Sequence, residues 1–225
     1  CIGSPEEFEK GCEILRPLTE HAAFEFLYIP GNHDAYVRNS RCRSQLEQAF
    51  RTLNKDRWTL DALPRRLQLN NLQLYVVNEA HPRNPVLSDG FLTVKAQNRL
   101  KKWLEEPREK TEKRILVGHF PLADVNGKPY GRRRRLRQAP WLLEKLRGGL
   151  LDIALCGHEH RPFVREEDNG SSEICAGSLT AAGLLSVIDY EPSEGRFRQF
   201  WEDVSGPDSP AAEAPPSLAP AGAVD

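Results

Sequence analysis

The sequence contains no methionine, at position 1 or anywhere else. A chain without one cannot be a complete translation product that kept its initiator, so we expect a fragment whose preceding segment matters for function. No apolar run approaches the roughly 20 residues that cross a bilayer, and no charged-then-apolar leader opens the chain. These absences predict no membrane span and a cytoplasmic location.

Cysteine is also scarce, and its spacing excludes two further classes of protein. The five cysteines are far apart, and no two of them form a CxxC pair. They are Cys1, Cys12, Cys42, Cys156 and Cys175. Neither a disulfide framework nor a zinc knuckle is therefore indicated, and a reducing compartment fits best. A formal net charge of -1 gives no global reason to expect a nucleic acid or an anionic membrane as a partner.

The remaining composition is that of a globular domain followed by a tail. With 225 residues, of which 39% are hydrophobic, the chain can bury one sizeable core. Residues 205–225 contain mainly Pro, Ala, Ser and Gly with a single Leu, so they cannot bury enough apolar area to offset the entropy of ordering. We therefore expect one domain over residues 1–204 and a disordered tail over residues 205–225.

Apolar periodicity and turn residues predict βα units first and a β meander afterwards. Ser4 and Pro5 mark the start of a helix that ends near Glu20, and Thr93 can cap a second helix that turns Val94, Leu100, Trp103 and Leu104 to one face. Further helices are expected over Ser40–Leu53 and Ala139–Arg147. Strands are expected over Phe24–Ile29, Arg66–Leu69, Leu72–Asn78, Arg114–Val117, Asp152–Cys156, Phe163–Glu166, Glu173–Ala176, Leu184–Tyr190 and Arg196–Trp201.

Four of the six histidines belong to three short motifs, each at the end of a predicted strand. The motifs are Gly31-Asn32-His33-Asp34, Gly118-His119-Phe120-Pro121 and Gly157-His158-Glu159-His160. Ligands of open α/β sheets gather just beyond the carboxyl ends of the strands, so the three segments should converge on one edge. A lone histidine at a strand end is usually a capping or solvated residue, and Asn and Asp favour tight turns. Together, the motifs predict a metal site.

These three motifs, in this order and each after a strand, resemble those of the calcineurin-like metallophosphoesterase family. The resemblance covers about Cys1 to Trp201. It implies an α/β (α+β) fold, a four-layer αββα sandwich that is here truncated at its amino end. It also implies hydrolysis of phosphate monoesters or diesters at a two-metal centre, with a phosphate-ester substrate whose identity is open.

The resemblance assigns roles to six residues. It makes Asn32, His119 and His158 ligands of one metal and His160 a ligand of the other. Imidazoles and an amide oxygen suit two divalent ions such as Mn, Fe or Zn. His33 would protonate the leaving-group oxygen, and Asp34 would raise the basicity of His33 and fix its tautomer.

The sequence departs from the family pattern before its first motif. The family also has an Asp-x-His element and a Gly-Asp element there, and neither occurs in this chain. Three implied ligands are therefore missing, including the carboxylate that bridges both metals. We expect this chain by itself to be weakly active or inactive. The alternative function is a non-catalytic scaffold of the same fold that binds partners.

A dense run of arginines follows the second motif and has two possible meanings. Arg132 to Arg135 and Arg137 lie in a loop that could border the site. Such a run is usually a solvated surface, but guanidinium groups that face the site could bind phosphate or attract a polyanionic substrate. A nucleic-acid-binding module is a weaker alternative, because no aromatic residues are interleaved with the run.

Overall fold

The computed structural model describes residues 3–21, 23–36, 39–83, 87–205 and 214–218. Its helices are α1 (Pro5–Glu20), α2 (Asn32–Ala35), α3 (Ser40–Leu53), α4 (Val94–Glu105), α5 (Ala139–Arg147) and α6 (Leu179–Ala182), with a 3-10 turn η1 at Leu60–Ala62. Its strands are β1 (Arg65–Leu69), β2 (Leu72–Val76), β3 (Lys113–Val117), β4 (Ile153–Cys156), β5 (Phe163–Glu166), β6 (Ser172–Cys175), β7 (Leu184–Glu191) and β8 (Arg196–Asp203).

A mixed sheet of six strands forms the centre of the molecule, in the order β1-β2-β3-β4-β6-β5. Strands β2, β3, β4 and β6 run parallel, and the two edge strands run antiparallel to their neighbours. Strands β7 and β8 form a separate antiparallel hairpin. Because neighbouring parallel strands end together, the residues that follow β3 and β4 are brought to the same edge.

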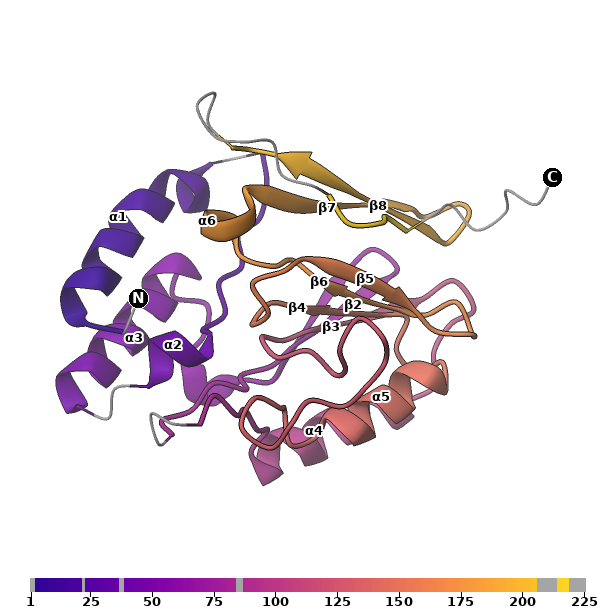
Figure 1. Cartoon of the computed structure of the whole chain (residues 1–225), viewed down its shortest axis with the longest axis horizontal. Coiled ribbons are helices and arrows are strands. Elements are labelled where there is room, and N and C mark those ends of the chain that lie inside the picture. Colours follow the sequence, from indigo (N-terminus) through magenta and orange to yellow (C-terminus); the bar gives the residue numbers. More distant parts are fainter. Residues whose placement is uncertain (1–2, 22, 37–38, 84–86, 206–213, 219–225) are drawn as a thin grey trace.

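Helices α4 and α5 cover one face of the large sheet, and the β7-β8 hairpin lies over its other face (Figure 1). The core on the helix side includes Tyr75, Leu100, Leu116 and Leu142. Between the two sheets, Ile115, Ile153 and Ile174 pack against side chains that include Ile188 and Phe197 of the hairpin. This layered α/β architecture confirms the expected fold class.

The helix ends follow the predicted capping chemistry. The Ser4 hydroxyl accepts a hydrogen bond from the Glu7 amide at 3.3 Å, and the Glu7 carboxylate accepts one from the Ser4 amide at 3.0 Å. In α4, however, the expected buried face was wrong at Val94, which is 75% exposed. The buried face consists of Ala96, Leu100 and Leu104, and Val94 precedes Ala96 by two residues, about 200° around the helix.

The expected strand over residues 24–29 is also wrong. The segment is extended but forms no ladder with a described strand. Side chains satisfy its backbone instead: the Tyr28 amide donates to Asn54 Oδ1 at 3.1 Å, and the Tyr28 carbonyl accepts from Asn54 Nδ2 at 3.0 Å. Arg57 donates to the Phe26 carbonyl at 2.8 Å. The other predicted strands are present, with ends that differ from the prediction by at most two residues.

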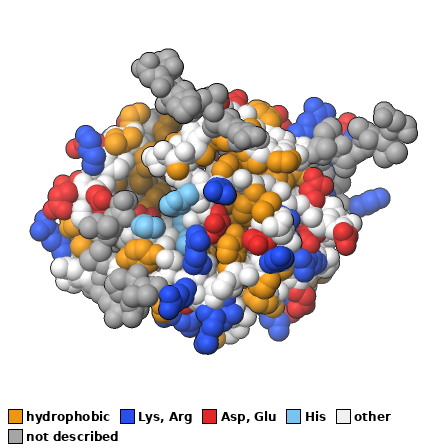
Figure 2. Space-filling view, in the orientation of Figure 1, with side chains coloured by type: hydrophobic (Ala, Val, Ile, Leu, Met, Phe, Trp, Pro, Cys, Tyr) orange, Lys and Arg blue, Asp and Glu red, His pale blue; other side chains and the backbone are white. Residues whose placement is uncertain are grey.

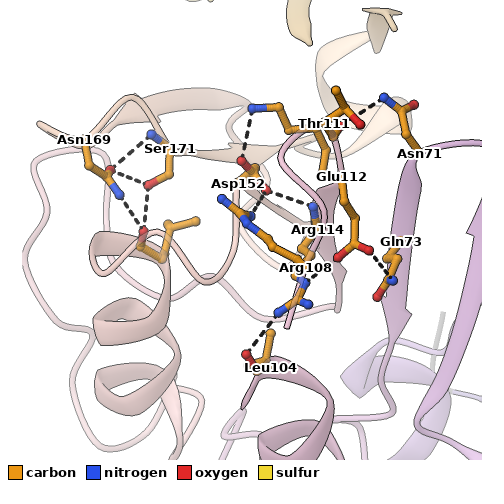
Figure 3. A network of polar contacts seen from close by, with 12 residues as sticks. Asn71, Gln73, Leu104, Arg108, Thr111, Glu112, Arg114, Asp152, Asn169 and Ser171 are labelled. Atoms are coloured by element: carbon orange, nitrogen blue, oxygen red, sulfur yellow. Dashed lines mark hydrogen bonds and ion pairs between the residues drawn. The ribbon is translucent and has the colours of Figure 1, made fainter. Parts of the chain in front are cut away.

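A polar network fixes the sheet at the end opposite the histidine motifs (Figure 3). The Arg114 side chain is 1% exposed and donates to Glu112 at 2.8 Å and to the Leu104 carbonyl at 3.0 Å. Asp152 accepts from the Arg114 amide and from the Arg108 guanidinium, both at 2.8 Å. The network therefore joins the end of α4 to the starts of β3 and β4.

The expected tail lies partly outside the described residues, since residues 206–213 and 219–225 are not described. In the described part, Leu218 packs against the cluster between the two sheets, and its amide donates to Gln199 Oε1 at 3.4 Å. The boundary at residue 204 remains a prediction. In the described part of the chain, no helix is both long and apolar enough to cross a membrane.

Candidate metal centre

The three motifs meet at the carboxyl edge of the large sheet. Nε2 of His119 lies 2.7 Å from Oδ1 of Asn32, and Nδ1 of His158 lies 3.2 Å from the same oxygen. The two imidazole rings have centroids 5.3 Å apart. Asn32 opens α2, His119 follows β3 and His158 follows β4, so the fold brings together three of the residues that the sequence singled out.

Two of the predicted residues lie at the edge of this cluster. His160 is exposed, although its charge contributes to the low pKa of His158. His33 is exposed on α2, and its ring contacts that of Tyr36 with centroids 5.0 Å apart. Figure 2 shows the histidine side chains gathered on one face of the molecule, with arginine and lysine side chains beside them.

Asp34 has a local role in the turn that presents Asn32. Its Oδ2 accepts a hydrogen bond from the Gly31 amide at 2.8 Å. Burial raises the pKa of Asp34, and the Gly31 amide, Tyr28 and the charge of His33 act in the opposite direction. The carboxyl thus fixes the turn that carries Asn32 and His33.

Burial keeps the central histidines neutral. It lowers the pKa of His119 to about 3, and the neighbouring charges of His158 and His33 add to the shift. It lowers the pKa of His158 to about 4, helped chiefly by the charge of Arg134. Neutral imidazole is the form that binds metal ions, so both side chains are ready to act as ligands at neutral pH.

The backbone around the cluster is adapted to this close approach. A Cβ atom on Gly31 would lie 2.7 Å from Cε1 of His119, which is closer than such atoms come, so glycine is required there. His158 itself has a φ of 64°, in the left-handed region that non-glycine residues rarely adopt. Strained backbone of this kind is concentrated at functional sites.

Sequence reasoning missed Glu79, which is 1% exposed. Its Oε2 accepts hydrogen bonds from the amides of His119 at 2.7 Å and Phe120 at 2.8 Å. Burial raises the pKa of Glu79 to about 7, although these amide donors oppose the shift. The available signal was an acidic residue directly after a predicted apolar strand.

A second buried carboxylate, Glu173, was also missed. It accepts hydrogen bonds from the amides of Leu122 at 2.5 Å and Ala123 at 3.3 Å, and it forms an ion pair with buried Arg165. Its signal was a charged residue within the apolar strand predicted over Glu173–Ala176. Glu79 and Glu173 therefore hold the backbone that follows β3, including the backbone of His119.

The donor atoms fit one metal ion. Two ligand atoms that each lie 2.0–2.2 Å from the same ion are separated by about 3 Å, which is close to the distances from Asn32 to the two histidines. An amide oxygen and two neutral imidazoles suit a borderline divalent ion. Within the described residues, however, no group of three or more His, Cys, Asp or Glu side chains could hold a metal.

Comparison with known proteins agrees with the fold. A family model described as calcineurin-like phosphoesterase matches residues 5–162. The crystal structure of a dimetal phosphatase from Danio rerio is similar with a TM-score of 0.61 and 12% identity, over 89% of this chain and 76% of that one. A putative 5'-nucleotidase from Staphylococcus aureus has a TM-score of 0.52 and 17% identity, over 85% of this chain and 40% of that one. No curated protein sequence matches significantly.

Proposed function

Because this chain belongs to the calcineurin-like phosphoesterase family, we propose that it carries part of a two-metal centre that hydrolyses a phosphate ester. One observation carries the proposal: ring nitrogens of His119 and His158 lie 2.7 and 3.2 Å from Oδ1 of Asn32, although the three residues come from distant segments of the chain. The dimetal phosphatase of similar fold supports the same function.

Asn32, His119 and His158 would hold one divalent ion (Mn, Fe or Zn), and His160 would contribute to the other. When bound, the ions would polarise the phosphoryl oxygens and supply an activated water as the nucleophile. The orientation of Asn32 supports this assignment, because its Nδ2 donates to the Tyr36 hydroxyl and its Oδ1 is thereby left facing the two histidines.

His33 would donate the proton to the leaving-group oxygen. It is exposed beside the cluster, so a substrate can reach it, and it is carried by the turn that Asp34 fixes. Glu79 keeps the His119 backbone in place through its bond to the His119 amide. Glu79 would thus position His119, and His33 would protonate the leaving group, while the metal centre would supply the nucleophile.

Three donors for one ion and one for the other make an incomplete centre. We therefore propose that this chain alone is weakly active or inactive, and that full activity requires a bridging carboxylate from outside the described residues. A non-catalytic scaffold of the same fold is the alternative. It predicts no metal-dependent hydrolysis in any form of the protein.

The test measures Mn- and Zn-dependent hydrolysis of 4-nitrophenyl phosphate and bis(4-nitrophenyl) phosphate by the full-length protein. We expect His158→Ala to lower kcat/KM by at least about a hundredfold, because one ligand of the metal is lost. The control is His21→Ala, an exposed histidine outside the three motifs. Equal activity in the wild type and in His158→Ala would contradict the proposal.

Metal binding is tested separately on the chain described here. Calorimetric titration with Zn²⁺ should show one site that Asn32→Ala weakens by about tenfold or more, while His21→Ala leaves it unchanged. This readout does not depend on catalysis. Unchanged affinity in Asn32→Ala would remove that residue from the ligand set.

A further inference from the structure

A surface cavity of about 550 Å³ is lined almost entirely by arginine. Its lining residues are Arg83, Leu87, Asp89, Arg132, Arg133, Arg135 and Arg137. Five arginines and one aspartate thus line the cavity, so four positive charges are not compensated by the lining. Such a concentration of like charge is costly unless an anion occupies it.

Two of these arginines are held rigidly in place. Asp89, whose side chain is 5% exposed, accepts two hydrogen bonds from Arg83 at 2.8 and 3.0 Å and one from Arg137 at 3.1 Å. The two guanidinium groups also lie near the ring of Phe91, at 5.7 Å for Arg83 and 5.4 Å for Arg137. Groups fixed in this way lose little entropy when they bind a ligand.

The other three arginines are available to a ligand. Arg132, Arg133 and Arg135 have no ion-pair partner among the described residues. Their backbone is nevertheless anchored, since the Gly90 amide donates to the Arg135 carbonyl at 3.1 Å and the Arg137 amide donates to the Gly90 carbonyl at 3.0 Å. The cavity therefore combines a fixed wall with guanidinium donors that are not already paired.

The two segments that line the cavity also contact the histidine motifs. Gly90 follows the lining residue Asp89, and a Cβ atom on it would lie 2.3 Å from the ring of Phe120, the residue after His119, so this segment packs against the second motif. Arg134 forms an ion pair at 3.0 Å with Glu159, which lies between His158 and His160. Figure 2 shows positive side chains next to the histidines on the same face.

We propose that this arginine cavity binds a phosphate group of the substrate other than the one that is hydrolysed, so that the substrate carries at least two phosphate groups. Planar guanidinium groups bind phosphate oxygens bidentately and keep their charge at any relevant pH. The inference rests on the proposed function and specifies its substrate class. Of the two meanings that the sequence allows for the arginine run, the inference takes phosphate binding.

The first experiment measures binding without catalysis. Calorimetric titration of the metal-free chain with tripolyphosphate should give a saturable site. The triple variant Arg132→Gln, Arg133→Gln and Arg135→Gln should weaken it by about tenfold or more, because three charge-assisted contacts are lost.

The matched control removes the same charge elsewhere, by Lys102→Gln, Lys110→Gln and Arg198→Gln, all at exposed positions. The affinity of this control variant for tripolyphosphate should stay within about twofold of the wild type, since the three residues do not line the cavity and exposed charges are screened by salt. An equal loss in both triple variants, or no binding by the wild type, would overturn the proposal.

The second experiment separates a substrate phosphate from free phosphate that acts as a regulator. In full-length protein, the arginine triple variant should raise KM for fructose 1,6-bisphosphate and leave KM for fructose 6-phosphate unchanged. If instead added inorganic phosphate alters both rates equally and the variant abolishes only that response, the cavity is a regulatory site and the proposal fails.

The outcomes also distinguish this inference from the proposed function. If the full-length protein hydrolyses neither nitrophenyl ester while the arginine variant still loses tripolyphosphate binding, the proposed function fails and the anion site stands. If both fructose esters are hydrolysed and the variant changes neither KM, the proposed function stands and the cavity has no part in substrate binding.

Discussion

Two segments after β3 use charge in opposite ways. In residues 118–123, the histidine loop, buried Glu79 and Glu173 accept hydrogen bonds from four backbone amides. In residues 131–137, the arginine loop, the charges belong to the loop itself, and most of its arginine side chains are exposed. Buried charge fixes a backbone because leaving it unpaired is costly, whereas exposed charge costs little and stays available to a ligand.

The largest effect should come from the buried charges. Glu173→Ala removes one of the two ion-pair partners of buried Arg165, the other being Glu167, and leaves the Leu122 amide without its acceptor. We expect the free energy of unfolding to fall by about 3 to 5 kcal/mol, measured by urea denaturation. The double variant Glu173→Leu with Arg165→Met should lose less, because both charges are then removed together. A loss below about 1 kcal/mol in the single variant would contradict this account.

An intermediate effect should appear as pH dependence of the metal-free chain. The pKa values of His119 and His158 are lowered to about 3 and about 4. Below about pH 6.5, the folded chain therefore binds fewer protons than the unfolded chain, in which both histidines become protonated. Stability should therefore fall as the pH decreases from 6.5 to 4. Urea denaturation at pH 7, 5.5 and 4 should show a shallower fall in His158→Gln.

Glu79 should act in the opposite direction over nearly the same range. Its pKa is raised to about 7, so the folded chain holds a proton that the unfolded chain releases above about pH 4.3. Its contribution to stability is full at low pH and is lost as the pH rises to 7. Glu79→Gln should therefore steepen the loss of stability on acidification. If the free energy of unfolding of Glu79→Gln changes with pH in parallel with that of the wild type, Glu79 does not titrate in this range.

The smallest effect should come from the arginine loop. Arg134→Gln breaks an ion pair with Glu159 in which the arginine side chain is 59% exposed. We expect less than about 1 kcal/mol of lost stability by urea denaturation. The pKa of His158 should rise, because the charge of Arg134 helps to lower it. Proton NMR titration of the histidines measures this shift, and an unchanged pKa would show that Arg134 acts only on Glu159.

Local rules worked where neighbours in sequence decide the outcome. The Ser4 cap, the bounds of α3 and α5, and the turn between β1 and β2 depend on hydrogen bonds and backbone preferences within a few residues. They failed for residues 24–29, where apolar composition suggested a strand. There the amide and carbonyl of Tyr28 bond to the side chain of Asn54, 26 residues away, instead of to a neighbouring strand. The roles given to Asn32, His33, Asp34, His119, His158 and His160 all remain predictions.

The sequence by itself determined the four longer helices, the strands of both sheets and the three histidine motifs, because hydrophobic periodicity, caps and turns are local properties. Only the tertiary structure decided that Asn32, His119 and His158 converge on one point, and that Glu79 and Glu173 lie beneath the histidine loop. It also decided that Arg83 and the arginine loop enclose one cavity. These relations join residues far apart in the chain, and they exist only once the parallel sheet brings its strand ends together.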